Sequence, residues 1–415
     1  MRLIILPLLL VTVGALAQDT IRIELKEAEQ RFLKENLLLL AQRYQVDANK
    51  ALIQQAKLWP NPQGYAELSA YTPSTGYFDI GKNGQKAFSI QQLIVTAGKR
   101  HKNVQMATEQ AKLTELEFFD LLRTLRFELR QNFYTLHYTL LTYQRYSQQL
   151  LLIEGLLRSF EIQYQKGNLP MKEVVRLKTL YFQLNNDRTE LFNEIAEREK
   201  ELKTLLHSPS IVLPVVDEAK LSAYQSGQWQ LLNLADSALN NRTDFKIAQS
   251  QTKLALLNYS LQRREAVPDI QIGAMHDQAS AYVPNYNAIT FSIPLPLWNR
   301  NQGNIRSAKH SLEVARTQEE QRMMEITNEV LATRVKLEQV EKEYQRATET
   351  LGPDIEVLNK SVNENFQKRN LSLLEFVDFF ESYNENILQF NRLKMSRLST
   401  YEELNFVTGS ELFKP

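Results

Sequence analysis

Residue types that could do chemistry are sparse in this chain and poorly spaced for it. The five histidines stand apart, and none has the His-x-x-x-His spacing of two metal ligands on one helix face: His101, His137, His207, His276 and His310. The absence of cysteine excludes thiol catalysis, disulfides and cysteine metal sites. No phosphate loop, dinucleotide fingerprint or nucleophile elbow is found. We therefore predict no enzyme activity, no cofactor and no metal site.

Two other groups of residues could meet a passing ion. Met323 and Met324 offer soft thioether sulfurs, although methionine on a long helix usually serves packing. Three carboxylates, those of Glu173, Glu375 and Asp378, follow the two turns of long helical hairpins. An acid in the first turn of a helix is also favoured by the helix dipole alone, so two interpretations of Glu173 and Glu375 stay open. The balance of 49 basic and 48 acidic residues gives no electrostatic argument for nucleic acid.

Long helices must position these acids. Few glycines or prolines interrupt residues 99–207 and 304–408, where the breakers are Gly155, Gly167, Pro170, Gly352 and Pro353. Leucine, valine and aromatic residues recur there every three or four positions, which is typical of coiled-coil seams. A helix over residues 99–165 would extend roughly 100 Å at ~1.5 Å per residue. The pattern predicts extended antiparallel helical hairpins rather than compact domains.

The two halves of the chain share one plan. Tyr164–Leu169 matches Phe366–Leu371, and Ala87–Ile90 matches Thr290–Ile293. More than half of the glycines and prolines gather in two windows, residues 60–98 and 268–303. These windows predict matching β-hairpins inserted into a helical chain, so we infer an internal duplication.

Each repeat is expected to run short helix, strand, strand, long helix, turn, long helix. The predicted organisation is a signal peptide at 1–17, a first repeat at 18–208, a linker or equatorial segment at 209–228, a second repeat at 229–409 and a C-terminal tail at 410–415. Strands are predicted at about 64–73, 85–95, 269–279 and 286–296, and hairpin tips near 167–169 and 369–371.

The first seventeen residues have the form of a secretion signal. Arg2 precedes an apolar run from Leu3 to Val13, and Ala15-Leu16-Ala17 has the small-x-small form of a cleavage site. The run is shorter than the roughly 20 apolar residues of a membrane-spanning helix. We therefore expect export, with a mature start at Gln18.

The predicted strands alternate apolar and polar residues. In the last one, Ile289, Phe291 and Ile293 share one face, and Thr290 and Ser292 share the other. Such alternation places one face against apolar surroundings and the other against water, and each run is near the ~9–11 residues of a tilted transmembrane strand. Aromatic residues cluster near the strand ends, where a membrane-interface belt would lie: Tyr65, Tyr71, Tyr77, Tyr282, Tyr286 and Trp298.

A small soluble sheet capped by helices would show the same alternation, but the export signal and the helix length favour a membrane. Four strands cannot close a barrel, and open sheet edges are not tolerated in lipid. Several chains must then share one barrel, with eight strands from two copies or twelve from three.

With these features the chain resembles the TolC-type outer-membrane efflux protein family along essentially its whole mature length. The segment Ser292–Ile305, followed by Ala308, is similar to the heavy-metal (CzcC/CusC-like) branch of that family. The resemblance implies a mostly helical fold with a small β part, built from duplicated long helical hairpins and four transmembrane strands per chain. It also implies a homotrimer with a 12-stranded β-barrel and a 12-helix periplasmic tunnel.

The implied function is that of a passive exit duct in the outer membrane, with a large periplasmic extension and a gated periplasmic end. Its implied partners are a periplasmic adaptor protein, an inner-membrane pump of the resistance–nodulation–division (RND) type and outer-membrane lipid, with no nucleic acid. Heavy-metal cations are the expected cargo. A duct for drugs or for type I secretion would share the fold, and a soluble periplasmic coiled-coil scaffold is a further alternative.

The resemblance also places site residues. The family's hairpin tips, where an adaptor would dock, correspond to Gly167, Asn168, Leu169, Arg369, Asn370 and Leu371. Arg369 departs from the glycine that the family prefers in this turn. In a trimer the carboxylates beyond the tips would recur three times and form a negative ring that favours cations, which makes gate candidates of Asp378, Glu375 and Glu173.

Overall fold

The structure is a computed structural model that describes residues 19–74, 76–81, 84–218, 221, 233–280, 283–351 and 354–413. The predicted signal peptide, Tyr282 and part of the predicted linker lie outside these residues. The chain forms two compact units. Unit 1 comprises Met1–Leu37, Arg123–Asn233 and Leu331–Pro415, and unit 2 comprises Leu38–Leu122 and Leu234–Val330.

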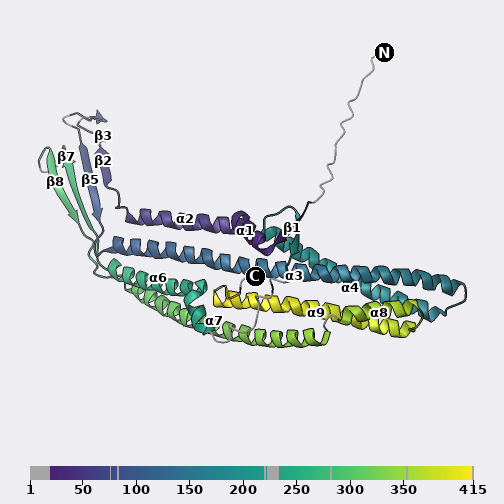
Figure 1. Cartoon of the computed structure of the whole chain (residues 1–415). Coiled ribbons are helices and arrows are strands. Elements are labelled where there is room, and N and C mark those ends of the chain that lie inside the picture. Colours follow the sequence, from purple (N-terminus) through teal and green to yellow (C-terminus); the bar gives the residue numbers. More distant parts are fainter. Residues whose placement is uncertain are drawn as a thin grey trace, which may run out of the picture. The chain divides into compact units, whose positions relative to one another are not determined.

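Helices dominate both units, which confirms the expected mostly helical fold (Figure 1). The two longest, α3 (Lys99–Gln165) and α7 (Gln302–Leu351), each have residues in both units. The remaining helices are α1 (Leu25–Glu35), α2 (Leu37–Lys57), α4 (Met171–Leu205), α5 (Leu234–Asn241), α6 (Thr243–Glu265), α8 (Asp354–Gln367) and α9 (Leu373–Thr408). Within the described residues, none is both long and apolar enough to span a bilayer.

Unit 2 holds a four-stranded antiparallel sheet to which each repeat contributes two strands (Figure 1). Its strands, in spatial order, are β2 (Gln63–Leu68), β5 (Lys86–Ile94), β7 (Ile270–Asp277) and β8 (Tyr286–Ser292). β3 (Tyr71–Thr72) and β4 (Gly76–Tyr77) form a separate small hairpin. Within the described chain, β2 and β8 therefore each pair on one side only.

All four predicted strands are longer than the observed ones, and the two largest differences have identifiable reasons. The strand expected at about 64–73 is divided, because Ser69 N–H still donates to Gln85 O while Ala70 O already accepts from Phe78 N–H in the next hairpin. β8 ends at Ser292, short of residue 296, since Pro294 and Pro296 have no N–H for a ladder.

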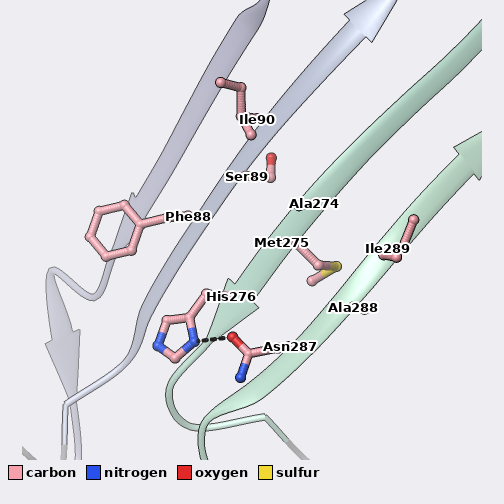
Figure 2. Close-up of a pocket in the computed structure, with 9 residues that line it drawn as sticks. All are labelled: Phe88, Ser89, Ile90, Ala274, Met275, His276, Asn287, Ala288 and Ile289. Carbon is pink, nitrogen blue, oxygen red and sulfur yellow. Dashed lines mark hydrogen bonds between the residues drawn. The ribbon is translucent and has the colours of Figure 1, made fainter.

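The register of the sheet separates its two faces. Ile90 pairs with Ala274, and Ala274 pairs with Ile289, so these three side chains share one face (Figure 2). That face carries Phe88, Ile90, Ile272, Ala274, Ile289 and Phe291, and the opposite face carries Ser89, Gln91, Gln271, Met275, Ala288 and Thr290. Ile289 is 86% exposed and Phe291 64% exposed in the single chain. An apolar face of this extent indicates a lipid or protein neighbour.

In unit 1, β1 (Thr20–Glu24) pairs in parallel with β6 (Ile211–Val215). The predicted linker, residues 209–228, thus contains β6, and pairing with β6 holds β1 at the start of the described chain. The buried Arg130 of α3 forms ion pairs with Glu29 in α1, Glu402 in α9 and Glu411 in the C-terminal tail. These ion pairs connect the first helix to the C-terminal end of the chain. Burial alone would lower the pKa of Arg130, but the carboxylates outweigh it and raise that pKa, so the guanidinium stays charged.

The first helical segment of each repeat is interrupted at one buried residue. Asn36 separates α1 from α2 with φ −68° and ψ 118°, and Arg242 separates α5 from α6 with φ −63° and ψ 128°. Asn36 Nδ2 donates to Leu205 O at 3.0 Å, whereas Arg242 binds the carboxylates of Asp244 and Glu329. The two repeats therefore share a backbone geometry and stabilise it with different chemistry.

Gly273, in the centre of β7, provides a test of how tightly the sheet is built. A Cβ there would lie 2.6 Å from Ile90 O and 2.7 Å from Thr290 Oγ1. We predict that Gly273→Val destabilises the protein by about 1–3 kcal/mol, because the flanking strands must move apart.

The matched control is Gly64→Val in β2, where no atom lies within 4 Å of the added carbon. Thermal unfolding monitored by circular dichroism should show a lower transition for Gly273→Val only. Equal transitions for the two variants would contradict the close packing at Gly273.

Candidate functional site

The two predicted hairpin tips lie in unit 1, where the helices beside them share one apolar core. Ile153, Leu177 and Phe380 are fully buried in it. The core comprises Tyr146, Leu150, Ile153, Leu177, Leu180, Leu184, Leu191, Leu373, Phe376, Val377 and Phe380. It draws on α3, α4 and α9, so both hairpins are held together near their tips.

Stacked aromatic rings extend this core toward the tips. Phe366 in α8 stacks on Phe376 in α9, with ring centroids 4.1 Å apart, and on Phe160 in α3 at 6.3 Å. Phe160 precedes the first tip by two turns and Phe366 precedes the second by one. The structure thereby connects the segments that lead into the two tips.

The two turns have the same hydrogen bonds. In the first, Gly167 N–H donates to Tyr164 O and Asn168 N–H to Gln163 O, both at 2.9 Å. In the second, Arg369 N–H donates to Phe366 O at 3.0 Å and Asn370 N–H to Asn365 O at 2.9 Å. The pattern, with one residue at positive φ, is that of a helix C-terminus closed by a left-handed residue.

The residue at positive φ differs between the turns. Gly167 has φ +77°, which costs glycine little, whereas Arg369 has φ +61°, a conformation that side chains with a Cβ rarely adopt. The departure from glycine noted in the sequence therefore does not change the backbone of the turn. It introduces strain and a positive side chain at an exposed tip.

The other tip residues behave alike in the two repeats. Asn168 Nδ2 donates to Gln163 Oε1 at 2.8 Å, and Asn370 Nδ2 donates to Asn365 Oδ1 at 3.1 Å. Leu169 and Leu371 are half-buried, while the asparagines are exposed. Each tip thus presents a polar, hydrogen-bonded turn beside one partly accessible leucine.

The three predicted gate carboxylates have different surroundings. Glu375 belongs to a capping box at the start of α9, in which Ser372 N–H donates to Glu375 Oε2 at 2.8 Å and Glu375 N–H donates to Ser372 Oγ at 3.3 Å. Glu173 lies in the first turn of α4. Asp378 is exposed and lies beyond the first turn of α9. The geometry supports the helix-start interpretation for Glu375 and leaves Asp378 available to solvent.

The cap also affects the charge of Glu375. Hydrogen bonds from the Ser372 side chain, and then from its backbone, lower the pKa of the Glu375 carboxyl. A carboxyl with a lowered pKa contributes stability above its ordinary pKa, and this contribution is lost as the pH falls through the lowered value. The start of α9 is therefore stabilised at neutral pH.

Sequence reasoning missed Ser372, although the Ser-x-x-Glu spacing of Ser372 and Glu375 is the recognised pattern of a capping box. It also missed the stacked rings, which join residues from distant segments. Among the described residues, no group of three or more histidines or acids is arranged to hold a metal ion.

Comparison with known proteins agrees with this fold. Residues 234–358 match the family model described as outer membrane efflux protein. The chain is similar in structure to CusC, with a TM-score of 0.74 at 16% identity, covering 93% of this chain and 92% of that one. No curated protein matches.

Two further solved structures are the Campylobacter jejuni CmeC outer membrane channel and the open state of the Neisseria gonorrhoeae MtrE outer membrane channel. CmeC matches with a TM-score of 0.76 at 13% identity, covering 93% of this chain and 85% of that one. MtrE matches with a TM-score of 0.72 at 15% identity, covering 94% of this chain and 89% of that one.

The solved structures confirm the fold that the resemblance implies, and the match to the efflux protein family model extends over residues 234–358. The descriptions of CusC, CmeC and MtrE all name a channel. The heavy-metal branch remains a prediction.

The strain at Arg369 can be tested directly. We predict that Arg369→Gly stabilises the second tip by about 0.5–1 kcal/mol, because glycine adopts positive φ without the clash of a Cβ. Gly167→Ala should destabilise the first tip by about 1 kcal/mol for the same reason, since no neighbouring atom lies within 4 Å of the added carbon.

Hydrogen exchange of the tip amides measures both effects locally, and slower exchange is expected in Arg369→Gly and faster exchange in Gly167→Ala. Faster exchange in Arg369→Gly would mean that the arginine side chain makes a stabilising contact that outweighs its backbone strain.

Proposed function

We propose that this protein is the outer-membrane exit duct of a tripartite efflux system, a passive channel that exports heavy-metal cations. One observation supports it above the others. A four-stranded sheet with one apolar, exposed face and one polar face is attached to long helical hairpins in the fold of outer-membrane channels. Such a sheet suits a wall between lipid and water.

The edges of the sheet support a shared barrel. In lipid, the unpaired backbone groups of β2 and β8 would each cost several kcal/mol, so both edges need a strand partner. Because β2 and β8 run in opposite directions, the β8 edge of one chain and the β2 edge of the next would meet as antiparallel neighbours. Three copies would close a 12-stranded barrel, the arrangement that we propose.

The hairpin tips support docking to a periplasmic adaptor. They are hydrogen-bonded and polar, and the two turns repeat the same geometry, so three chains would present six equivalent turns. We assign this contact to Gly167, Asn168, Leu169, Arg369, Asn370 and Leu371. An RND pump of the inner membrane would supply the energy, since the chain has no recognisable motif for chemistry of its own.

The cargo proposal rests on the likeness of Ser292–Ile305 to the heavy-metal branch. A duct for drugs or type I secretion shares this fold and is the alternative within transport. The soluble scaffold is disfavoured, because Ile289, Leu295 and Trp298 would expose large apolar side chains to water.

Deletion of the gene tests the cargo. We expect the deletion strain to grow less well in at least one of zinc, cobalt, cadmium, copper and silver, and to resist a panel of drugs as before. Restoring the gene should restore metal tolerance. Unchanged metal tolerance together with drug sensitivity would favour the alternative cargo, provided that related ducts are also deleted.

Conductance of the purified channel tests the gate. We predict that Asp378→Asn lowers the cation-over-anion permeability ratio, because three exposed carboxylates are lost from the trimer. Glu375→Gln should leave this ratio nearly unchanged, since that side chain is engaged in the helix cap.

The measurement should be made at 0.1 M and at 1 M salt, where the screening length falls from about 10 Å to about 3 Å. A charge ring predicts a large effect of Asp378→Asn at the lower concentration only. Equal ratios in the native channel and Asp378→Asn at both concentrations would exclude Asp378 from the gate.

A further inference from the structure

The two hairpin tips carry an excess of positive charge. The turn between α3 and α4 and the turn between α8 and α9 lie at the same end of unit 1 (Figure 1). Within residues 163–173 and 365–375, the charged side chains are four cations and two acids: Lys166, Lys172, Lys368, Arg369, Glu173 and Glu375. All four cations are exposed. Since the whole chain has a net charge of only +1, the excess is a local property of the tips.

Helix stability accounts for two of these cations. Lys166 directly follows the last residue of α3, and Lys368 directly follows the last residue of α8. A positive side chain is favoured at such a place, because the C-terminal end of a helix dipole is negative. Lys166 and Lys368 therefore need no ligand to explain them.

The other two cations are placed against local preference. Lys172 is the second residue of α4, where the positive end of the helix dipole disfavours a cation. Arg369 holds a φ of +61°, where glycine would be unstrained. Neither side chain forms an ion pair with any residue that the structure describes. Lys178, less than two turns further along α4, does pair with Glu161 at 2.8 Å. Local stability thus explains neither Lys172 nor Arg369, whereas an anionic partner would explain both.

Large apolar side chains are exposed near these two cations. Met171, which precedes Lys172, is 52% exposed, and Leu374, in the first turn of α9 after Arg369, is 47% exposed. A protein interface combines apolar side chains at its centre with a polar rim. The tips provide both components.

We propose that the partner that docks on these tips presents an acidic protein surface, with carboxylates opposite Lys172 and Arg369 and an apolar contact for Met171 and Leu374. The inference rests on the proposed adaptor contact and gives the chemistry of that partner. Opposite charges across an interface speed association and fix the register of the two surfaces. A polyanion that is not a protein is disfavoured as occupant, because it has no apolar side chain to cover Met171 and Leu374.

The test measures binding of two synthetic amphipathic helices to the full protein in detergent by fluorescence anisotropy. Both helices have leucine on one face, and the other face carries glutamate in the first helix and lysine in the second. We expect the glutamate helix to bind more tightly than the lysine helix. Lys172→Gln and Arg369→Gln together should weaken its binding about tenfold, at about threefold for each exposed charge pair. Binding should also weaken from 0.1 M to 1 M salt, where the screening length falls to about 3 Å.

Lys200→Gln is the matched control, since it removes one exposed positive charge from α4 far from the tip and should leave binding unchanged. A second variant reverses the charge. Lys172→Glu combined with Arg369→Glu should bind the lysine helix in preference, a gain that misfolding cannot produce.

Three results would overturn the proposal. The first is equal binding of the two helices to the native protein, and the second is an equal loss in Lys200→Gln and in the neutralised tip variant. The third is binding of polyphosphate that depends on Lys172 and Arg369 while the glutamate helix does not bind.

The acidic contact and the duct can fail separately. A protein that forms ion-conducting particles and binds both helices equally refutes the acidic contact alone. A protein that stays a soluble single chain refutes the proposed function, and the adaptor contact with it.

Discussion

The two edges of one sheet, each without a strand partner among the described residues, constrain the rest of this protein. Among the described residues, β2 is paired with β5 only and β8 with β7 only, while one face of the sheet exposes Phe88, Ile90 and Phe291. Water could solvate the edges but not the apolar face, and lipid could cover the face but not the edges. The proposed shared barrel would meet both demands together, because sister chains would supply the missing strands within a membrane.

The duplicated plan explains how one chain can contribute a regular portion of such an assembly. Both repeats donate two strands to one sheet, and both close their hairpin with the same turn. Where the repeats differ, the backbone is kept and the side chain changes. Asn36 and Arg242 occupy the same kind of helix break, and Gly167 and Arg369 the same left-handed position. The geometry of the repeat is thus more constant than its chemistry.

The sequence alone predicts the features that depend on residues close together in the chain, and it does not predict those that depend on residues far apart. The alternation of Ile289, Thr290 and Phe291 predicts the two faces of β8, because neighbours in a strand point to opposite sides. The order β2-β5-β7-β8 and the register between β5 and β7 join residues almost 200 positions apart, and no local pattern encodes them. Pro294 and Pro296, in contrast, are a local pattern from which the early end of β8 can be predicted.

In the candidate site, too, local features can be predicted from the sequence and long-range contacts cannot. The turn at Gly167 is readable from the glycine itself, and the capping box at Ser372 and Glu375 was readable from its spacing. The stack of Phe160, Phe366 and Phe376 depends on the packing of three helices, so no local pattern in the sequence predicts it.

The most direct test of the central claim is the mass of the native particle, measured after extraction of the outer-membrane fraction with detergent. The 415-residue chain has a mass of 48.2 kDa, and we predict a particle that contains three copies of the chain. Recovery of a monodisperse single chain in plain buffer, absent from the membrane fraction, would contradict the shared lipid-embedded sheet on which the proposed duct depends.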